Sequence, residues 1–161
     1  MKLTARDVMS TEVITVSAET KVEEAAAYLA GYRITGLPVL DEHGAVVGLV
    51  NDFDLIGKHG PQVGDIMSTQ VISVSPDTDL EELGHILTSR HIRRLPVVQA
   101  GRLVGIVTRG DLIRRIAQRW VCGMCGAFER GARPPDHCTS CEAPADKFTL
   151  EDEPPMMYRD R

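Results

Sequence analysis

The feature that most constrains the fold of this chain is an internal repeat. Residues 8–56 align with residues 66–113 once His43 is skipped, and 22 of the 48 aligned pairs are identical. A duplication of this size predicts two copies of one folding unit. A unit of about 50 residues with a half-covered sheet is too small to be stable alone. We therefore expect the two units to pack together around a pseudo-twofold axis, with clefts between them.

Each copy predicts the element order strand, helix, strand, strand, helix. The predicted strands lie at residues 13–16, 37–40, 46–50, 71–74, 95–98 and 103–107. Capping-box patterns, Thr20 with Glu23 and Thr78 with Glu81, predict the start of the first helix of each copy. The last helix of the second copy is expected to run over residues 111–119. The predicted fold class is therefore α+β, with two βαββα units.

Composition and charge narrow the class of protein. The chain has 161 residues, 43% of them hydrophobic, and a formal net charge of −5. No apolar run approaches the roughly 18 residues that a membrane span needs, and the N-terminal segment lacks a signal-peptide core. These features predict a cytoplasmic protein. The acidic balance argues against nucleic acid as the main partner, because contacts to phosphates require clustered Lys and Arg.

Four cysteines follow the repeat. From Trp120 onward, Gly, Pro and Cys replace the aliphatic pattern, which indicates a domain boundary. Cys122 and Cys125 form one Cys-x-x-Cys pair, and Cys138 and Cys141 form a second pair after twelve intervening residues. In a reducing compartment this spacing predicts one tetrahedral metal site rather than two disulfides. Four thiolates suit both zinc and iron, so the spacing alone leaves Zn and Fe open.

The repeat resembles a tandem pair of CBS domains, a regulatory arrangement also called a Bateman module. The resemblance rests on Met9-Ser10, on the Leu-Pro-Val segment of each copy, and on the matching runs at residues 48–54 and 105–111. It covers about residues 1–118. It implies that clefts between the copies bind adenosine-containing ligands such as AMP, ADP, ATP or S-adenosylmethionine. It also implies a homodimer, no enzymatic activity and no catalytic residues.

The candidate ligand residues lie where a strand passes into a helix. Thr108 and Asp111 bring a hydroxyl and a carboxylate to a helix N-terminus, and a carboxylate can accept two hydrogen bonds from a ribose diol. The alternative for this pair is a simple helix cap. The resemblance favours ligand binding and extends it to Asn51 and Asp54 of the first copy, where Asn51 replaces the Thr or Ser expected in the family.

Phosphate groups of a nucleotide would require cations. Arg93 and Arg94, just before the second Leu-Pro-Val segment, can supply them; the alternative is a solvated loop. The resemblance allows these arginines to serve either cleft, so their cleft is left open. The apolar residues expected to flank adenine are Ile14, Val16, Ile72 and Val74.

Residues 120–150 resemble the rubredoxin-like domain at the C-terminus of rubrerythrins. The resemblance runs from Trp120 through both Cys-x-x-Cys pairs to Phe148. It favours iron, whereas Cys141 lacks the following Gly of true rubredoxins. The alternative is a metal that only folds the lobe, since bound metal would replace the core that about 30 residues cannot build. The net charge of residues 120–161 is −3, which disfavours a lobe that grips nucleic acid.

The sequence thus predicts four segments. They are a first CBS repeat at residues 1–60, a second at 61–119, a four-cysteine metal domain at 120–150 and an acidic tail at 151–161. The predicted function is a regulatory protein in which binding of an adenosine ligand signals, through a lobe with one Zn or Fe ion, to a protein partner. The alternatives are a nucleotide-gated electron carrier with rubredoxin-type iron and a transcription-associated zinc ribbon.

Overall fold

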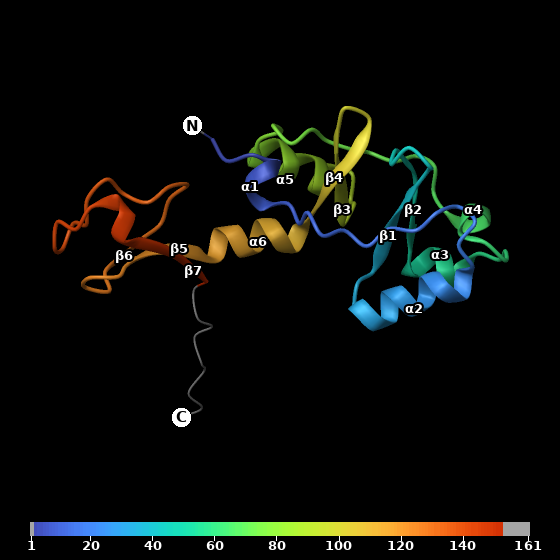
Figure 1. Ribbon diagram of the computed structural model, residues 1–161, viewed down its shortest axis with the longest axis horizontal. Coiled ribbons are helices and arrows are strands. Elements are labelled where there is room, and N and C mark those ends of the chain that lie inside the picture. Colours follow the sequence, from blue (N-terminus) through green and yellow to red (C-terminus); the bar gives the residue numbers. More distant parts are fainter. Residues whose placement is uncertain (1, 153–161) are drawn as a thin grey trace, which may run out of the picture.

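The computed structural model describes residues 2–152, and Figure 1 shows the two repeats beside each other with the cysteine lobe at one end. Each repeat contains one antiparallel hairpin and two main helices. In the first repeat these are α2 (Val22–Tyr32), β1 (Gly36–Leu40), β2 (Val46–Asn51) and α3 (Asp52–Gly57). In the second they are α5 (Leu80–Ser89), β3 (Arg94–Gln99), β4 (Arg102–Thr108) and α6 (Arg109–Ala117). The α+β class is confirmed.

The first predicted strand of each copy is reduced to a single bridge. Val16 pairs in parallel with Val39 of β1, and Val74 pairs in parallel with Val97 of β3. The Val16 N–H donates to the Pro38 carbonyl at 3.1 Å, and the Leu40 N–H donates back to Val16 at 2.8 Å. These bonds still place the segment against the edge of the hairpin.

The helices α2 and α5 do not begin with the predicted capping boxes. The hydroxyl of Thr20 accepts instead from the backbone N–H of Ser17 at 3.1 Å, which closes a turn before α2. Thr78 accepts from Ser75 in the same way at 3.2 Å. The N-cap of α5 is Asp79, whose carboxylate accepts from the Glu82 N–H at 2.8 Å. A Thr hydroxyl can close a local turn as readily as it caps a helix, and here the turn is formed.

Short segments are exchanged between the repeats. The one-turn helix α1 (Ala5–Val8) lies at the N-terminus, yet Ala5 is buried in the core of the second repeat with Leu83 and Leu95. The equivalent helix α4 (Val63–Ile66) is buried in the core of the first repeat. Each repeat therefore completes the core of the other, and neither is an independent unit.

Backbone pairing secures this exchange. Ser10 bridges Ile106 of β4, and Ser68 bridges Leu49 of β2, with N–H to carbonyl distances of 2.8 to 3.0 Å. A Cβ on Gly105 would lie 2.6 Å from the sulfur of Met9. Gly48 has the same relation to Met67. Glycine is thus required at both positions by the close approach of the exchanged segment.

The cysteine lobe is a small sheet that follows α6 directly. Its strands are β5 (Gln118–Cys122), β6 (Phe128–Glu129) and β7 (Phe148–Asp152), in the order β6-β5-β7, with the 3-10 turn η1 (Ala145–Lys147) before β7. Helix α6 ends at Ala117, two residues earlier than expected, because Gln118 and Arg119 pair with β7. Strand β7 includes Glu151 and Asp152, the first two residues of the expected tail; residues 153–161 lie outside the described part of the chain.

Candidate functional site

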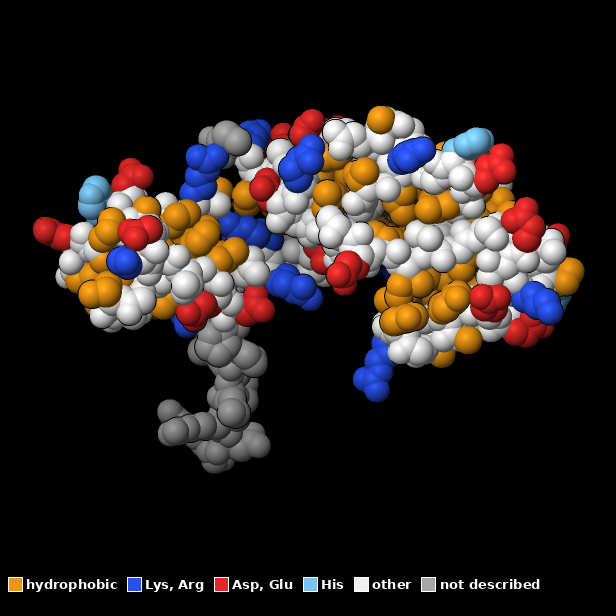
Figure 2. All heavy atoms as spheres, in the orientation of Figure 1, with side chains coloured by type: hydrophobic (Ala, Val, Ile, Leu, Met, Phe, Trp, Pro, Cys, Tyr) orange, Lys and Arg blue, Asp and Glu red, His pale blue; other side chains and the backbone are white. Residues whose placement is uncertain are grey.

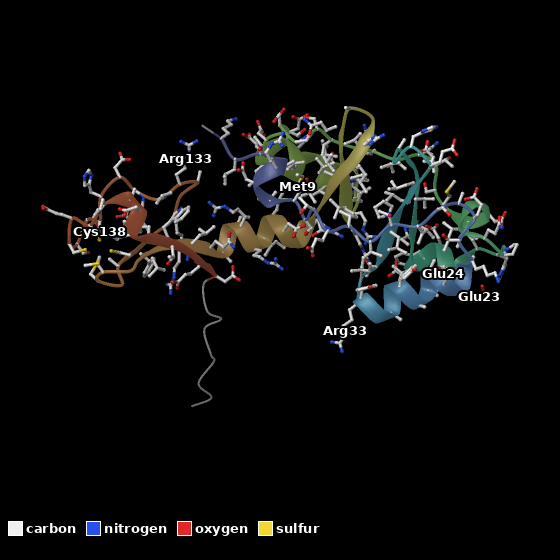
Figure 3. All side chains as sticks on the ribbon, viewed as in Figure 1. Met9, Glu23, Glu24, Arg33, Arg133 and Cys138 are labelled. Atoms are coloured by element: carbon white, nitrogen blue, oxygen red, sulfur yellow. The ribbon has the colours of Figure 1, made fainter. Side chains whose placement is uncertain are left out.

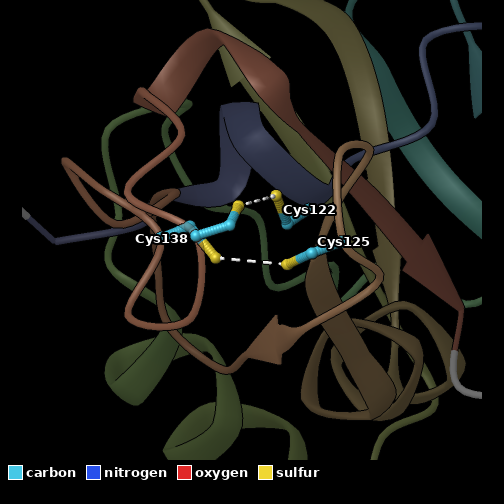
Figure 4. Close-up of side chains that lie close together, drawn as sticks. Cys122, Cys125 and Cys138 are labelled. Carbon is cyan, nitrogen blue, oxygen red and sulfur yellow. Dashed lines mark hydrogen bonds between the residues drawn. The ribbon is translucent and has the colours of Figure 1, made fainter.

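Four cysteine sulfurs converge in the lobe. The sulfurs of Cys122, Cys125, Cys138 and Cys141 all lie within 4.8 Å of one another. The sulfur of Cys122 lies 3.7 Å from that of Cys141, and the sulfur of Cys125 lies 3.6 Å from that of Cys138; Figure 4 shows Cys125 and Cys138 pointing toward each other. A tetrahedral ion with metal–sulfur bonds of about 2.3 Å places its sulfurs about 3.8 Å apart, whereas a disulfide needs about 2 Å. The arrangement therefore fits one tetrathiolate metal ion.

Backbone turns hold both Cys-x-x-Cys pairs. The Gly126 N–H donates to the Cys122 carbonyl at 2.8 Å, and the Glu142 N–H donates to the Cys138 carbonyl at 2.9 Å. Gly126 has a φ of 77°, and Glu142 occupies the equivalent position with a φ of 59°. The second turn thus adopts a left-handed conformation without glycine. The backbone N–H of Ser140 lowers the pKa of Cys138 to about 7. At Cys141 the Ala143 N–H also lowers the pKa, but hydrogen bonds among the cysteine sulfurs outweigh it and raise the value to about 12, so a metal would have to displace that proton.

The lobe also contacts α6 of the second repeat. Arg115 donates to the carbonyls of Gly131 and Ala132 at 2.9 and 3.3 Å. The indole N–H of Trp120 donates to the same Gly131 carbonyl at 3.1 Å. Within the lobe, the guanidinium of Arg119 lies 4.4 Å from the ring centroid of Phe128. The loop around Gly131, between the two Cys-x-x-Cys pairs, is therefore tied to the helix that begins at Thr108.

A first cleft lies between the repeats at the N-terminus of α6, and we call it the Asp111 cleft. It has a volume of about 210 Å³ and is lined from both repeats by Glu12, Ile14, Ile34, Pro38, Thr108 and Asp111, among others. One carboxylate oxygen of Asp111, Oδ2, accepts from the N–H and the hydroxyl of Thr108 at 2.7 and 2.8 Å. Within residues 2–152 no side chain donates to the other oxygen, Oδ1. This oxygen is available to a ligand.

The pseudo-symmetric cleft at α3, the Asn51 cleft, has a different chemistry. It has a volume of about 250 Å³, and Asn51, Phe53, Ile72, His91 and Arg93 are among its lining residues. Asp54 is not on its wall: this carboxylate is only 6% exposed. Its Oδ2 accepts from the Asn51 N–H at 2.9 Å, and its Oδ1 lies 2.7 Å from the Lys58 ammonium.

Of the two arginines, Arg93 lines the Asn51 cleft and Arg94 lines both clefts. Arg93 lies 3.9 Å from Asp52 and 5.7 Å from the ring of Phe53, on the wall of the Asn51 cleft. Arg94 lines both clefts, because its guanidinium reaches across the pseudo-twofold axis and donates to the hydroxyl of Thr35. Burial lowers the pKa of Arg94. A Cβ on Gly36 would overlap this guanidinium, so Gly36 makes the crossing possible.

Of the four residues expected beside adenine, two reach a cleft. Ile14 lines the Asp111 cleft and Ile72 lines the Asn51 cleft. Val16 and Val74 lie instead in the two cores, 6% and 9% exposed. Residues two apart on a regular strand share a face, so this difference follows from the reduction of each segment to a single bridge, at Val16 and at Val74.

The sequence reading missed other residues of the clefts. Arg33 and Arg109 line, with Arg93 and Arg94, a third cavity that adjoins the Asp111 cleft at Thr108. Figure 3 shows Arg33 at the end of α2 with its side chain extended from the body of the molecule. Arg33 is aligned with His91, and both adopt a positive φ, 53° and 52°. The alignment of the two copies was the signal that could have drawn attention to this pair.

Two exchanged βαββα repeats, each with a strand-to-helix cap beside an inter-repeat cleft, define a CBS-domain pair. The chain belongs to the CBS domain family, which matches residues 5–59 and 63–118. Residues 120–149 match the rubrerythrin, rubredoxin-like domain. Both resemblances seen in the sequence are therefore confirmed. No helix within residues 2–152 is long and apolar enough to cross a membrane.

Three similar proteins illustrate the family. The CBS domain-containing protein YhcV of Bacillus subtilis is 36% identical over 114 residues, which are 66% of this chain and 81% of that protein. The crystal structure of CBSX2 of Arabidopsis thaliana in complex with AMP has a TM-score of 0.66 and 36% identity, over 69% of this chain and 93% of that one. The CBS pair of MJ0100, in complex with 5-methylthioadenosine and S-adenosyl-L-methionine, has a TM-score of 0.66 and 30% identity, over 71% and 95%.

Proposed function

We propose that this chain is a regulatory protein that binds an adenosine-containing ligand in the Asp111 cleft. The observation that carries the proposal is the free Oδ1 of Asp111 at the N-terminus of α6, opposite apolar residues of the other repeat such as Ile14. A carboxylate can accept both hydroxyls of a ribose, and an apolar wall suits the face of a purine. The AMP and S-adenosyl-L-methionine complexes of similar CBS pairs support this ligand class.

The phosphate of a nucleotide would meet Arg94. This guanidinium lines the Asp111 cleft and also the adjoining cavity lined by Arg33, Arg93 and Arg109. Within residues 2–152, no acidic side chain lies on the wall of that adjoining cavity. AMP, ADP or ATP would therefore gain a charge-assisted contact that adenosine lacks. Calorimetric titration of the metal-loaded protein with adenosine and AMP tests both the binding of the nucleoside and the contact between the phosphate and Arg94. Absence of binding by either compound to folded protein would refute the proposed ligand class.

The four-cysteine lobe is proposed to pass the ligand state to a protein partner. Cys122, Cys125, Cys138 and Cys141 would hold one zinc or iron ion, and Arg115 joins the lobe to the helix that carries Asp111. The role is regulatory rather than enzymatic. Four free thiolates need a reducing compartment, which supports a cytoplasmic location.

A homodimer formed by the CBS pair is part of the same proposal. Large apolar side chains are exposed on equivalent helices: Phe53 and Ile56 on α3, 70% and 82%, and Ile113 and Ile116 on α6, 65% and 73%. Figure 2 shows hydrophobic side chains gathered over α2 and α3. Two helical patches related by pseudo-symmetry suit a second copy of the same surface. Sedimentation at micromolar concentration should give twice 17.7 kDa, and Ile56→Asp with Ile113→Asp should give the monomer mass.

An electron carrier is the second candidate, because two of the four cysteines reach the surface. Cys125 and Cys141 are exposed, whereas Cys122 and Cys138 are buried. Exposed sulfur ligands shorten the path for an electron to a docked partner. Protein purified from its own source should be red and bleach on reduction if the ion is iron, and colourless if it is zinc.

A further inference from the structure

The two repeats carry a cation at equivalent positions but use it differently. In the alignment Asp54 matches Asp111, and Lys58 matches Arg115. Each cation thus follows its aspartate by four residues. On a helix this spacing places the two side chains next to each other, and the order acid then base is the favourable one.

In the first repeat the pair is formed. The ammonium of Lys58 lies 2.7 Å from Oδ1 of Asp54. Asp54 is 6% exposed and does not line the Asn51 cleft. The first repeat therefore shows what a paired cation does to this aspartate: it occupies the oxygen that a ribose would otherwise use.

In the second repeat the pair is absent, and the cation contacts the lobe instead. The guanidinium of Arg115 donates to the Gly131 and Ala132 carbonyls at 2.9 and 3.3 Å. Trp120 of β5 donates to the same Gly131 carbonyl, which ties the loop to the strand that follows α6. Oδ1 of Asp111 is left without a donor from residues 2–152, and Asp111 lines its cleft.

We propose that Arg115 is a positioning residue that couples the metal lobe to the nucleoside site. With the metal-bound lobe docked, Arg115 is held by the two carbonyls and Asp111 is open to ribose. When the lobe loses its metal and its fold, Arg115 turns back to Asp111 and forms the pair that Lys58 and Asp54 show. The inference rests on the proposed function, since it describes the regulation of that same site.

Linkage gives this arrangement a reciprocal consequence. Ligand binding to Asp111 prevents the Asp111–Arg115 pair, so it favours the docked lobe and strengthens metal binding by the same factor. The metal affinity and docking of the lobe thereby depend on whether the Asp111 cleft is occupied, without a large movement of α6. Within the CBS pair, the competing states differ in the partner of one guanidinium.

Adenosine affinity is the main test, because adenosine is uncharged and makes no phosphate contact. Calorimetry compares the metal-loaded protein with a metal-free variant, Cys122→Ser with Cys125→Ser, after circular dichroism has shown that the CBS pair is folded. We expect the metal-free variant to bind adenosine about fivefold or more weakly. Equal affinity in the two forms would overturn the inference while leaving the proposed function intact. No binding to the metal-loaded protein would overturn the proposed function itself.

Two substitutions of Arg115 separate this role from a structural one. Arg115→Met removes the competitor, so adenosine affinity should stay high and no longer depend on metal. Arg115→Lys offers one ammonium that can pair with Asp111 as Lys58 pairs with Asp54, so affinity should fall even with metal bound. A purely structural role predicts the opposite order, with Lys the milder change. The exposed Arg114, whose side chain forms no hydrogen bond or ion pair with the lobe within residues 2–152, provides the control Arg114→Ala, which should leave metal dependence unchanged.

A ligand-free measurement completes the test. A double-mutant cycle of Asp111→Asn and Arg115→Met, read by chemical unfolding, should show a coupling in the metal-free background and none in the metal-loaded protein. Coupling of equal size in both backgrounds would overturn the inference, because Asp111 and Arg115 would then interact whether or not the lobe is docked.

Discussion

Replacement of Asp111 should weaken nucleoside binding far more than replacement of its counterpart Asp54. The Oδ2 atom of Asp111 accepts from the N–H and the hydroxyl of Thr108 at 2.7 and 2.8 Å, while Oδ1 has no side-chain donor within residues 2–152 and Asp111 lines the cleft. Asp111→Ala removes up to two charge-assisted bonds to a ribose, or about 2–3 kcal/mol. That loss corresponds to roughly 30- to 150-fold in Kd. Thr108→Ala removes one neutral hydroxyl and should cost about 1 kcal/mol.

Asp54→Ala is the matched control because both oxygens of Asp54 already have partners. Its loss leaves the Asn51 N–H and the Lys58 ammonium without this carboxylate, so stability should fall by about 1 kcal/mol while adenosine affinity at the Asp111 cleft is retained. Asp111→Asn controls for the cap, since its amide oxygen can still accept from Thr108. Calorimetric titration with adenosine and 2′-deoxyadenosine measures the change in affinity of each variant. Equal loss of adenosine affinity in the Asp54 and Asp111 variants would refute the reasoning, as would an unchanged preference for adenosine over 2′-deoxyadenosine in Asp111→Ala.

Three further predictions concern the lobe and the arginines. Removal of the metal by a chelator should unfold residues 120–150 and leave residues 1–118 folded, because the lobe core is little more than two cysteines, Ala143 and Phe148. Fluorescence of Trp120, the only tryptophan in the sequence, should report unfolding of the lobe, and circular dichroism should report the folded CBS pair. Retention of native Trp120 fluorescence in metal-free protein would contradict this. Glu142→Gly should stabilise the metal-loaded lobe by about 1 kcal/mol in chemical unfolding, because Glu142 has a φ of 59° where only glycine avoids strain; no change would mean that the turn relaxes. Arg94→Ala should weaken AMP about tenfold and adenosine hardly at all, with Arg102→Ala at the exposed start of β4 as the control, and equal losses for both ligands would exclude a phosphate contact.

Much of the architecture could be predicted because it is encoded locally and twice. The repeat required two copies of one unit, and the β-branched runs and Leu-Pro-Val segments marked the hairpins. The spacing of the four cysteines was enough to predict that their sulfurs converge on one site, since Cys-x-x-Cys turns place sulfurs on one side of a loop. Chemical type and local periodicity were sufficient for these features.

Helix starts were less predictable because one residue type serves two local structures. Thr20 and Thr78 carried the capping pattern, yet each hydroxyl closes a turn to a serine N–H three residues earlier. In a capping box each hydroxyl would accept from the N–H three residues later, so both outcomes use one hydrogen bond of the same kind but with different donors. Packing of the following helix against its hairpin decides between them.

Only the tertiary structure decided which surfaces meet. The exchange of α1 and α4 between the repeats cannot be read from the repeat itself, because either copy offers the same apolar pocket to Ala5. The crossing of Arg94 over Gly36 depends on that packing, as does the burial of Val16 and Val74.

The sequence likewise did not determine which partners two equivalent aspartates would have. Asp54 and Asp111 share one motif, but their cations meet different surroundings. Lys58 lies 2.7 Å from Asp54 and also donates to the Ile66 carbonyl of the exchanged helix α4 at 3.1 Å. The lobe instead brings two carbonyls to Arg115, and this contact between domains leaves Asp111 open.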